Sequence, residues 1–151
     1  MLPVLACSNN IIKKALETET ELSHLKLQKL LYLTYARFLH KYGKPLFSEQ
    51  FEKWQYGPVV PGVYERFKCF GAQSIGRFSR DCNNDIIVVS SASTQFHECL
   101  DEVWDKFGQK NGFELSMRTH RDGSAWSKTD DDVGILSQED IKEDGQKLFD
   151  I

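Results

Sequence analysis

Residues 25–42 read LKLQKLLYLTYARFLHKY and carry the longest helical pattern in the chain. Their apolar or weakly polar side chains recur with i, i+3, i+4, i+7 spacing, which is typical of an amphipathic helix. Further leucines at positions 25, 33 and 39 widen this apolar face, so we expect a central helix that other elements surround. Ser23 is suited to cap its start, while Gly43 and Pro45 are suited to end it. The residues with helical spacing are Leu27, Leu30, Leu31, Thr34, Tyr35, Phe38 and Tyr42.

Shorter helices are expected on both sides of this segment. Each has a cap or turn residue at one end and an apolar stripe within it. In the helix expected near residues 113–120, Leu115 and Met117 are the apolar members. The other expected helices cover residues 9–17 after Ser8, residues 61–70 opening on Pro61, the stretch from Ser93 or Thr94 to Phe107, and a last helix after Ser137.

The expected β content is small. Residues 51–55 alternate apolar and polar side chains, which indicates a short strand, although a helical turn also fits. Residues 86–89 read IIVV, a β-branched run that predicts a second strand, paired with the residues near Phe78 in a hairpin. The sequence therefore predicts a mainly α fold: a compact single-domain helical fold over residues 1–151, with a small β element (short strands near 51–55 and 76–89).

The composition excludes several classes of protein. The chain has 151 residues, and 12% of them are aromatic, more than a disordered chain carries. A single domain of this length can bury a hydrophobic core. No apolar run approaches the length of a membrane span, and the first residues lack the basic start of a secretory signal. Because the four cysteines are scattered and form no CxxC pair, we expect a cytoplasmic protein with free thiols.

The charge is unevenly distributed along the chain. There are 19 Lys and Arg against 22 Asp and Glu, a formal charge of −3, which disfavours non-specific nucleic-acid binding. Residues 130–151 alone carry a net charge of −6, and the rest of the chain carries +3. We expect this acidic tail either to dock on the basic body or to meet a basic surface of a partner.

No catalytic or metal-binding pattern is visible in the sequence. The four histidines are not paired at i+3 or i+4, and the acidic run at 130–132 lacks the spacing of a calcium loop. No glycine-rich phosphate motif is present. We therefore expect no metal, no cofactor and no catalytic residue. The rival interpretation is a hydrolase or transferase built around His120 or a cysteine.

Two groups of basic residues could serve as binding surfaces if either faced one side. Such a surface would suit an acidic partner or a backbone phosphate. The interpretation favoured for both groups is that they cover the solvent faces of amphipathic helices. The first group is Lys26, Lys29, Arg37 and Lys41, and the second is Arg66, Lys68, Arg77 and Arg80.

Two segments combine aromatic residues with turn chemistry. Residues 51–64 read FEKWQYGPVVPGVY, and residues 119–126 read THRDGSAW. Rigid aromatic side chains suit a binding surface, but a stiff turn packed on the long helix fits the first segment equally well. In the second segment, His120 near a helix C-terminus is interpreted as a structural cap, with Trp126 folding back on it.

Together with the long helix, these segments resemble the Panacea, or SocA-like antitoxin, domain. Residues 25–32 (LKLQKLLY) are similar to the LxLQKLLY signature that opens this domain. Residues 54–61 (WQYGPVVP), with Tyr64 one turn on, are similar to its AWxYGPVVPxxY segment. The order and spacing of the motifs agree over about residues 9–149, which is nearly the whole chain.

The third motif is the weakest of the three. Thr119-His120 and Trp126 resemble the closing TH…PW element of the domain. Ala125 stands where the pattern has Pro, and Lys53 stands where it often has Ala. Neither change removes a group that chemistry would need.

The resemblance implies a largely helical domain found in bacteria, phages and prophages. It implies an antitoxin that neutralises a cognate protein toxin by direct binding, with the toxin encoded by a neighbouring gene, and it implies no enzyme activity. The alternatives are a proteolytic adaptor that delivers a toxin to a Clp-type protease, and a phage or prophage protein that blocks a host defence protein. Many members of that family add a DNA-binding domain, which we do not expect in a chain of 151 residues.

We expect the motif residues to build the scaffold more than the interface. The candidate partner-binding residues are Tyr56, Val59, Val60 and Trp126. A polar-aromatic cluster of Lys29, Tyr32, Tyr56, Tyr64, His120 and Trp126 is expected to link the three segments. The full set of motif residues is Leu27, Gln28, Lys29, Leu30, Tyr32, Trp54, Tyr56, Gly57, Pro58, Val59, Tyr64, Thr119, His120 and Trp126.

Overall fold

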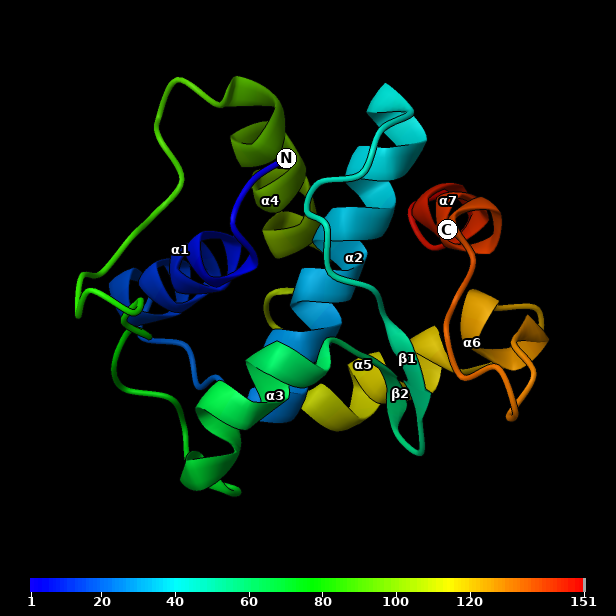
Figure 1. Ribbon diagram of the computed structural model, residues 1–151, viewed down its shortest axis with the longest axis horizontal. Coiled ribbons are helices and arrows are strands. Elements are labelled where there is room, and N and C mark those ends of the chain that lie inside the picture. The colour runs from blue at the N-terminus through cyan, green and yellow to red at the C-terminus, as the bar shows by residue number, and fades with distance from the viewer. Residues whose placement is uncertain (151) are drawn as a thin grey trace.

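The long helix runs through the middle of the molecule, and the other elements pack around it (Figure 1). The computed structural model describes residues 1–150, and it confirms a mainly α fold with a small β element. None of the helices in this range is long and apolar enough to cross a bilayer. The elements are α1 (Val4–Glu17), α2 (His24–Tyr42), β1 (Glu52–Trp54), β2 (Gly57–Val59), α3 (Pro61–Phe67), the 3₁₀ turn η1 (Lys68–Phe70), α4 (Thr94–Phe107), α5 (Gly112–Thr119), α6 (Ala125–Lys128) and α7 (Gln138–Lys147).

Helix α2 has the ends and the burial that its sequence predicts. The Ser23 hydroxyl accepts the N–H of Lys26 at its start, and Gly43 ends it with a left-handed φ of 69°. Its leucines at positions 27, 30, 31 and 33 are fully buried. The helix contacts α1, α3, α4, α5, α7 and β2, so it is the central, surrounded element that we expected.

The interpretation that the basic residues of α2 cover a solvent face is wrong for Lys26 and Lys29, which are buried, whereas Lys41 is exposed. Lys26 is buried, and its Nζ donates to the carbonyl of Gly108 over 2.7 Å. Lys29 is also fully buried. Arg37 and Lys41 both pair with Glu102 of α4, at 2.6 and 3.4 Å. These four cations hold α2 to its neighbours inside the chain.

The β element is one hairpin. The strand predicted at 51–55 is confirmed as β1, which pairs antiparallel with β2, with Lys53 opposite Pro58 and Trp54 opposite Gly57. The strand predicted at 86–89 is wrong, because this run and the residues near Phe78 are irregular. Side chains of α1 take the backbone groups that a partner strand would have used: Asn9 Nδ2 donates to the carbonyl of Ile87, and Asn10 Oδ1 accepts the N–H of Val89.

Several helix boundaries differ from the prediction. Helix α1 begins at Val4, before the predicted Ser8 cap, and the buried Ser8 hydroxyl donates back to the carbonyl of Val4. Helix α3 ends at Phe67, before η1, and α6 was not predicted. The starts of α3 at Pro61 and of α7 after Ser137 are confirmed.

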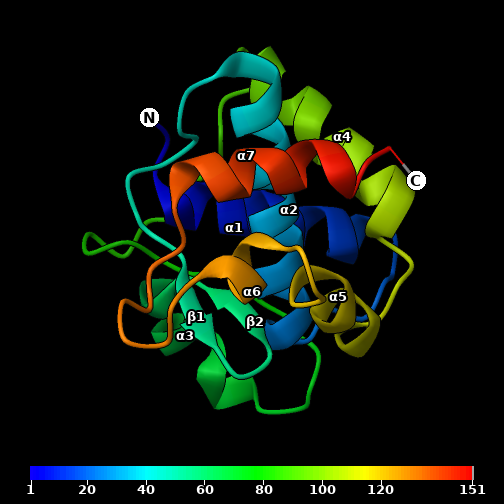
Figure 2. The ribbon, with the colours of Figure 1, turned by 90° about the vertical axis from the view of Figure 1, so that its right-hand side faces the viewer.

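The C-terminal helix lies directly against α2, as Figures 1 and 2 both show. The contact is closest at Gly145, where an added Cβ would overlap the carbonyl oxygen of Ala36. Beside it, Arg37 Nη1 donates to the carbonyl of Gly145 over 2.9 Å. The acidic tail therefore docks on the body of the molecule, and a glycine at position 145 allows that approach.

We expect Gly145→Ala to lower the free energy of unfolding by about 1–3 kcal/mol, because the two helices must separate to admit the methyl group. The matched control is Gly62→Ala in α3, where an added Cβ meets nothing within 4 Å. There alanine should leave the stability unchanged or raise it by up to about 1 kcal/mol. Urea unfolding followed by circular dichroism measures both. Equal effects of the two substitutions would contradict the close approach.

Candidate partner-binding surface

Side chains of α2 hold the hairpin by its backbone. Gln28 makes two bonds to Val60, because its Nε2 donates to the carbonyl over 3.1 Å and its Oε1 accepts the N–H over 3.0 Å. One residue on, Lys29 Nζ donates to the carbonyl of Pro58 over 2.6 Å. All of these groups are buried, so the first two motif segments form one internal framework.

The ammonium group of Lys29 is buried, and no carboxylate of residues 1–150 pairs with it. Burial alone lowers the pKa of its ammonium group from 10.5 to about 7. Gly57 packs over it with φ +115°, and an added Cβ would lie 3.0 Å from both Lys29 Cε and Thr119 Oγ1. The turn therefore requires glycine for its conformation and for its space. Thr119 brings the third motif segment to the same point.

Helix α5 fixes the tip of the hairpin. The Ser116 hydroxyl donates to the carbonyl of Tyr56 over 2.6 Å and lies 3.3 Å from Nδ1 of His120. The backbone of Tyr56 is thus held between Ser116 and the constrained Gly57. Its side chain, in contrast, is 57% exposed.

Trp126 joins α6 to the same hairpin. Its Nε1 donates to the carbonyl of Trp54 over 2.6 Å, and its ring lies 5.2 Å from that of His120. Lys53 Nζ lies 4.4 Å from the centre of the Trp126 ring and pairs with Asp131 at 3.1 Å. The half-buried indole is therefore fixed by the hairpin, α5 and a lysine.

Behind this surface, Asp144 connects α7 to α2 and α6. Tyr32 Oη donates to its carboxylate over 2.5 Å, and the N–H of Ala125 donates to it over 3.2 Å. Burial raises the pKa of Asp144, and burial together with the Asp144 charge raises the pKa of Tyr32 well above 10. Proline at position 125, as in the family pattern, would lack the N–H that Asp144 accepts here.

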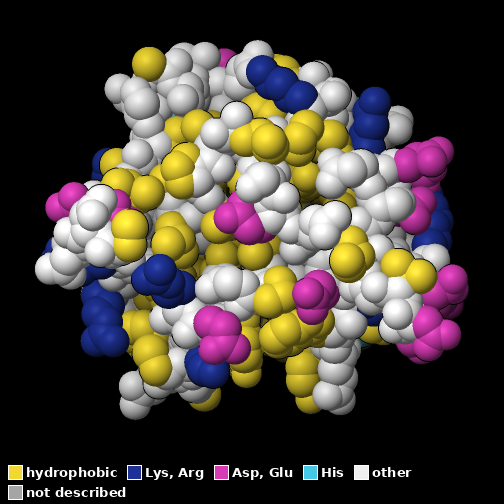
Figure 3. All heavy atoms as spheres, viewed as in Figure 1, with side chains coloured by type: hydrophobic (Ala, Val, Ile, Leu, Met, Phe, Trp, Pro, Cys, Tyr) yellow, Lys and Arg dark blue, Asp and Glu magenta, His cyan; other side chains and the backbone are white. Residues whose placement is uncertain are grey.

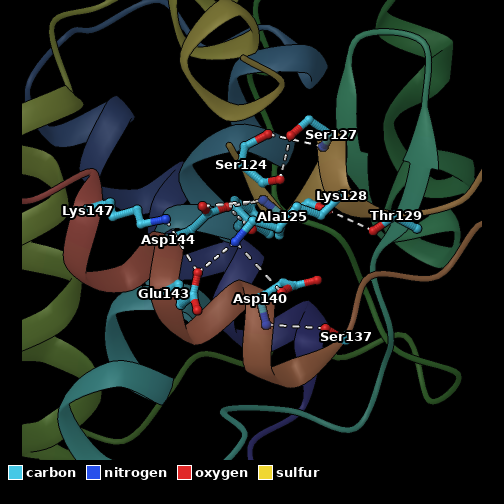
Figure 4. A network of polar contacts seen from close by, with 11 residues as sticks. Ser124, Ala125, Ser127, Lys128, Thr129, Ser137, Asp140, Glu143, Asp144 and Lys147 are labelled. Carbon is cyan, nitrogen blue, oxygen red and sulfur yellow. Dashed lines mark hydrogen bonds and ion pairs between the residues drawn. The ribbon is translucent and has the colours of Figure 1, made fainter. Parts of the chain in front are cut away.

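Figure 4 shows how α7 faces α6 around this carboxylate. Lys128 of α6 pairs with Glu143 at 2.7 Å, and Lys147 reaches the same carboxylate at 3.4 Å. Ser124 and Ser137 cap the starts of α6 and α7. Figure 2 shows α6 between α7 and the hairpin. The C-terminal helix thereby supports the segment that carries Trp126.

The six residues expected in one polar-aromatic cluster do not form one. His120 and Trp126 are in contact, whereas Tyr64 packs on Trp54, with ring centres 4.8 Å apart, and on His24. Lys29 and Tyr32 are buried and reach Pro58 and Asp144 separately, and the Tyr56 side chain points outward. What links the three segments is the backbone of the hairpin.

The predicted binding residues differ in exposure. Tyr56 is exposed and Trp126 is half-buried, while Val59 and Val60 are only 6% and 1% exposed, within the chain's own core. The sequence reasoning missed Phe113 and Met117, which are 67% and 54% exposed on α5. Met117 is therefore not a core member of its helix. The signal was its spacing of two from Leu115, since residues i and i+2 face different sides of a helix.

We call Tyr56, Phe113 and Met117 the α5 patch. Phe113 and Met117 are four residues apart and so lie on one face of α5. Ser116, which lies between them in the sequence, holds the carbonyl of Tyr56. Large apolar side chains are thus exposed on α5 and on the hairpin turn that α5 holds, which makes this region the candidate interaction surface.

The two buried cysteines are not activated as nucleophiles. Burial raises the pKa of Cys7 to about 12 and that of Cys99 to about 11, so both thiols stay protonated at neutral pH. Within residues 1–150, no group of three or more His, Cys, Asp and Glu side chains is arranged to hold a metal ion.

Comparison with known proteins identifies the family. The family model described as "Antitoxin SocA-like, Panacea domain" matches residues 27–127. The chain belongs to this SocA-like Panacea family. The antitoxin SocA of Caulobacter vibrioides (strain NA1000 / CB15N) is 35% identical over 127 residues, which are 80% of this chain and 66% of that protein. The match thus spans just under two thirds of that relative, and no solved structure matches the chain.

The Panacea match contains the surface described above. It begins within α2, includes the hairpin and α5, and ends within α6. Helix α7 lies outside it and docks through Asp144 and Gly145. The matched family and the matched relative both carry the description of a SocA-type antitoxin.

The buried Lys29 should make the stability of this Panacea domain depend on pH. Between its folded pKa of about 7 and its unfolded value of 10.5, the unfolded chain holds a proton that the folded chain has released. The free energy of unfolding then rises with pH in this window, by at most about 1.4 kcal/mol per pH unit. Lys29→Met removes this term, so the unmodified chain should gain stability relative to the variant between pH 7 and pH 9.

Urea unfolding across that pH range tests this expectation. The control is Lys13→Met on the exposed face of α1, where the side chain has only a 3.9 Å contact with Glu17. Its stability should follow the unmodified chain in parallel. If the Lys29→Met curve also runs parallel, Lys29 does not titrate in this window.

Proposed function

We propose that this protein is an antitoxin that neutralises a cognate protein toxin by binding it directly. Membership of the SocA-like family supports the antitoxin role. The observation that supports direct binding is the α5 patch, whose exposed apolar side chains are held by hydrogen bonds to the hairpin backbone. The toxin would be the product of a neighbouring gene, and both proteins would act in the cytoplasm.

The α5 patch has the side chains that dominate protein interfaces. Aromatic residues and methionine are enriched at the centres of interfaces, and a few of them supply most of the binding energy. The backbone of Tyr56 is already fixed by Ser116 and Gly57, so binding would order little more than its ring. Trp126 and His120 extend the surface from the neighbouring segment.

Neutralisation by this surface would be stoichiometric. A stable inhibitory complex buries at least roughly 1,000 Å² in total, which needs the α5 patch together with its polar surroundings. Such a complex blocks the toxin's active surface by occupying it, and it makes or breaks no covalent bond. The proposal therefore assigns no catalytic residue to this chain.

Co-expression with the neighbouring gene product tests the proposal. The unmodified chain should restore growth and bind the toxin in isothermal titration. Tyr56→Ser combined with Phe113→Ser should weaken binding by about 30-fold or more, because central interface residues contribute at least about 2 kcal/mol. The control is Ile86→Ser with Val88→Ser, two side chains that are also exposed but lie away from α5.

Two results would contradict this function. Continued growth arrest with both proteins present would remove the antitoxin role. Equal toxin affinity of the α5 variant and the control variant would keep the role and reject the surface.

Rescue in cells lacking Clp-type protease subunits separates occlusion from delivery to a protease. Occlusion needs only the complex, so we expect growth rescue and toxin level to be the same with and without the protease. The measurement is colony formation together with the amount of toxin in the cells. Rescue that disappears without the protease would support an adaptor mechanism instead.

A further inference from the structure

Three arginines surround a hollow that the antitoxin surface does not use. Arg66 lies on α3, and Arg77 and Arg80 lie on the loop that follows η1. With Phe70 and Phe78 they line a hollow of about 260 Å³, which we call the arginine pocket. In Figure 3, Lys and Arg side chains gather at the lower left, over the end of α3 and this loop.

No carboxylate of residues 1–150 pairs with the charges of this pocket. Among residues 1–150, none of the three arginines forms an ion pair, unlike Arg37 and Lys41 of α2. The nearest acidic residues in the sequence are engaged elsewhere. Glu65 pairs with Lys68 at 2.6 Å, and Asp81 accepts the backbone N–H groups of Asn83 and Asp85 over 2.9 Å each.

The arginine side chains are nevertheless held in place. Arg66 Nη1 donates to the carbonyl of Arg80 over 2.8 Å, and Arg80 Nη1 donates to the carbonyl of Asn84 over 2.9 Å. The Arg77 guanidinium lies over the Phe70 ring, 5.0 Å from its centre. Each guanidinium retains N–H groups beyond those used in these contacts.

A side chain of α1 holds the backbone of this loop. The buried Asn9 makes two 2.9 Å bonds to Ser79, one from its Nδ2 to the carbonyl and one from the Ser79 N–H to its Oδ1. Ser79 lies between Arg77 and Arg80 in the sequence. The backbone that carries both arginines is thus set before any ligand arrives, which lowers the entropy cost of binding.

We propose that the arginine pocket binds an acidic peptide segment of a partner protein. Guanidinium groups match carboxylates with paired N–H donors, and arginine clusters are a recurring means of recognising acidic motifs. The volume is smaller than that of most small-molecule sites and suits one or two side chains. A glutamate or aspartate would meet the arginines, and an adjacent apolar side chain would contact Phe78.

The surroundings favour a peptide over a nucleic acid. The Phe70 face is covered by Arg77, so it offers no open platform on which a base stacks. This inference stands apart from the antitoxin proposal, because it concerns α3 and its loop and its test needs no toxin.

Titration of the ¹⁵N-labelled full chain tests the pocket by NMR. The probe is an amidated peptide with two glutamates on each side of a phenylalanine, and the same peptide with glutamines is its neutral counterpart. We expect saturable amide shifts confined to residues 64–85 with the glutamate peptide and none with the glutamine peptide. Added salt should weaken the binding.

Substitutions link the shifts to the three arginines. The variant R66Q/R77Q/R80Q should lose about tenfold or more in affinity for the glutamate peptide. The single variant R77Q, which leaves the Arg66 and Arg80 backbone contacts intact, should lose part of it. The control R118Q/R121Q removes two arginines near α5 and should bind like the unmodified chain. Amide spectra outside the loop verify that each variant is folded.

Three results would overturn the proposal. One is the absence of saturable shifts in residues 64–85, and another is an unchanged affinity of the triple arginine variant. The third is tighter binding of a short oligothymidylate or of inorganic phosphate at the same amides, which would mark a nucleic-acid or a simple anion site.

Discussion

The hairpin is positioned by hydrogen bonds between its buried backbone groups and side chains of α2, and the positions of α5 and α6 depend on the hairpin. β2 has three residues and one partner strand, so the polar groups on its other side lie against a helix. Unpaired, each would cost on the order of 1–3 kcal/mol. Lys29 pairs the carbonyl of Pro58 in β2, Gln28 pairs both backbone groups of Val60 just after it, and the register of the hairpin on α2 follows from these contacts. Tyr56, α5 and Trp126 are then placed by bonds to the hairpin backbone.

This arrangement explains why a lysine is tolerated in the core. Its ammonium group has one carbonyl partner and no carboxylate, so burial drives its pKa toward neutrality. A hydrophobic residue would avoid that desolvation but would leave the carbonyl of Pro58 unpaired. The long, flexible stem of lysine also reaches past Gly57, the residue that leaves room for it. The LQK and YGP segments therefore depend on each other physically.

Local patterns in the sequence predict some of these features and miss others. The spacing of apolar residues predicts α2, and Ser23, Gly43, Pro61 and Ser137 predict helix ends, because these signals act within one turn. The IIVV run has the composition of a strand, yet Asn9 and Asn10 of α1 bind its backbone. These residues are far from the run in the sequence, so the local pattern does not predict the contact. Likewise, lysines on an amphipathic helix suggest solvent, whereas the partners of Lys26 and Lys29 come from segments far along the chain.

The acidic and basic residues that are separated along the sequence also lie at different places in the fold. Much of the acidic tail is used internally, since Asp144 is buried and Glu143 pairs with Lys128 and Lys147. Asp131 remains largely exposed next to Lys53, at the Trp126 edge of the candidate partner-binding surface, while the arginine pocket lies at the end of α3. A partner that engages both surfaces would gain affinity from apolar contacts and orientation from charges of opposite sign at two separate points, and a wrong orientation would juxtapose like charges.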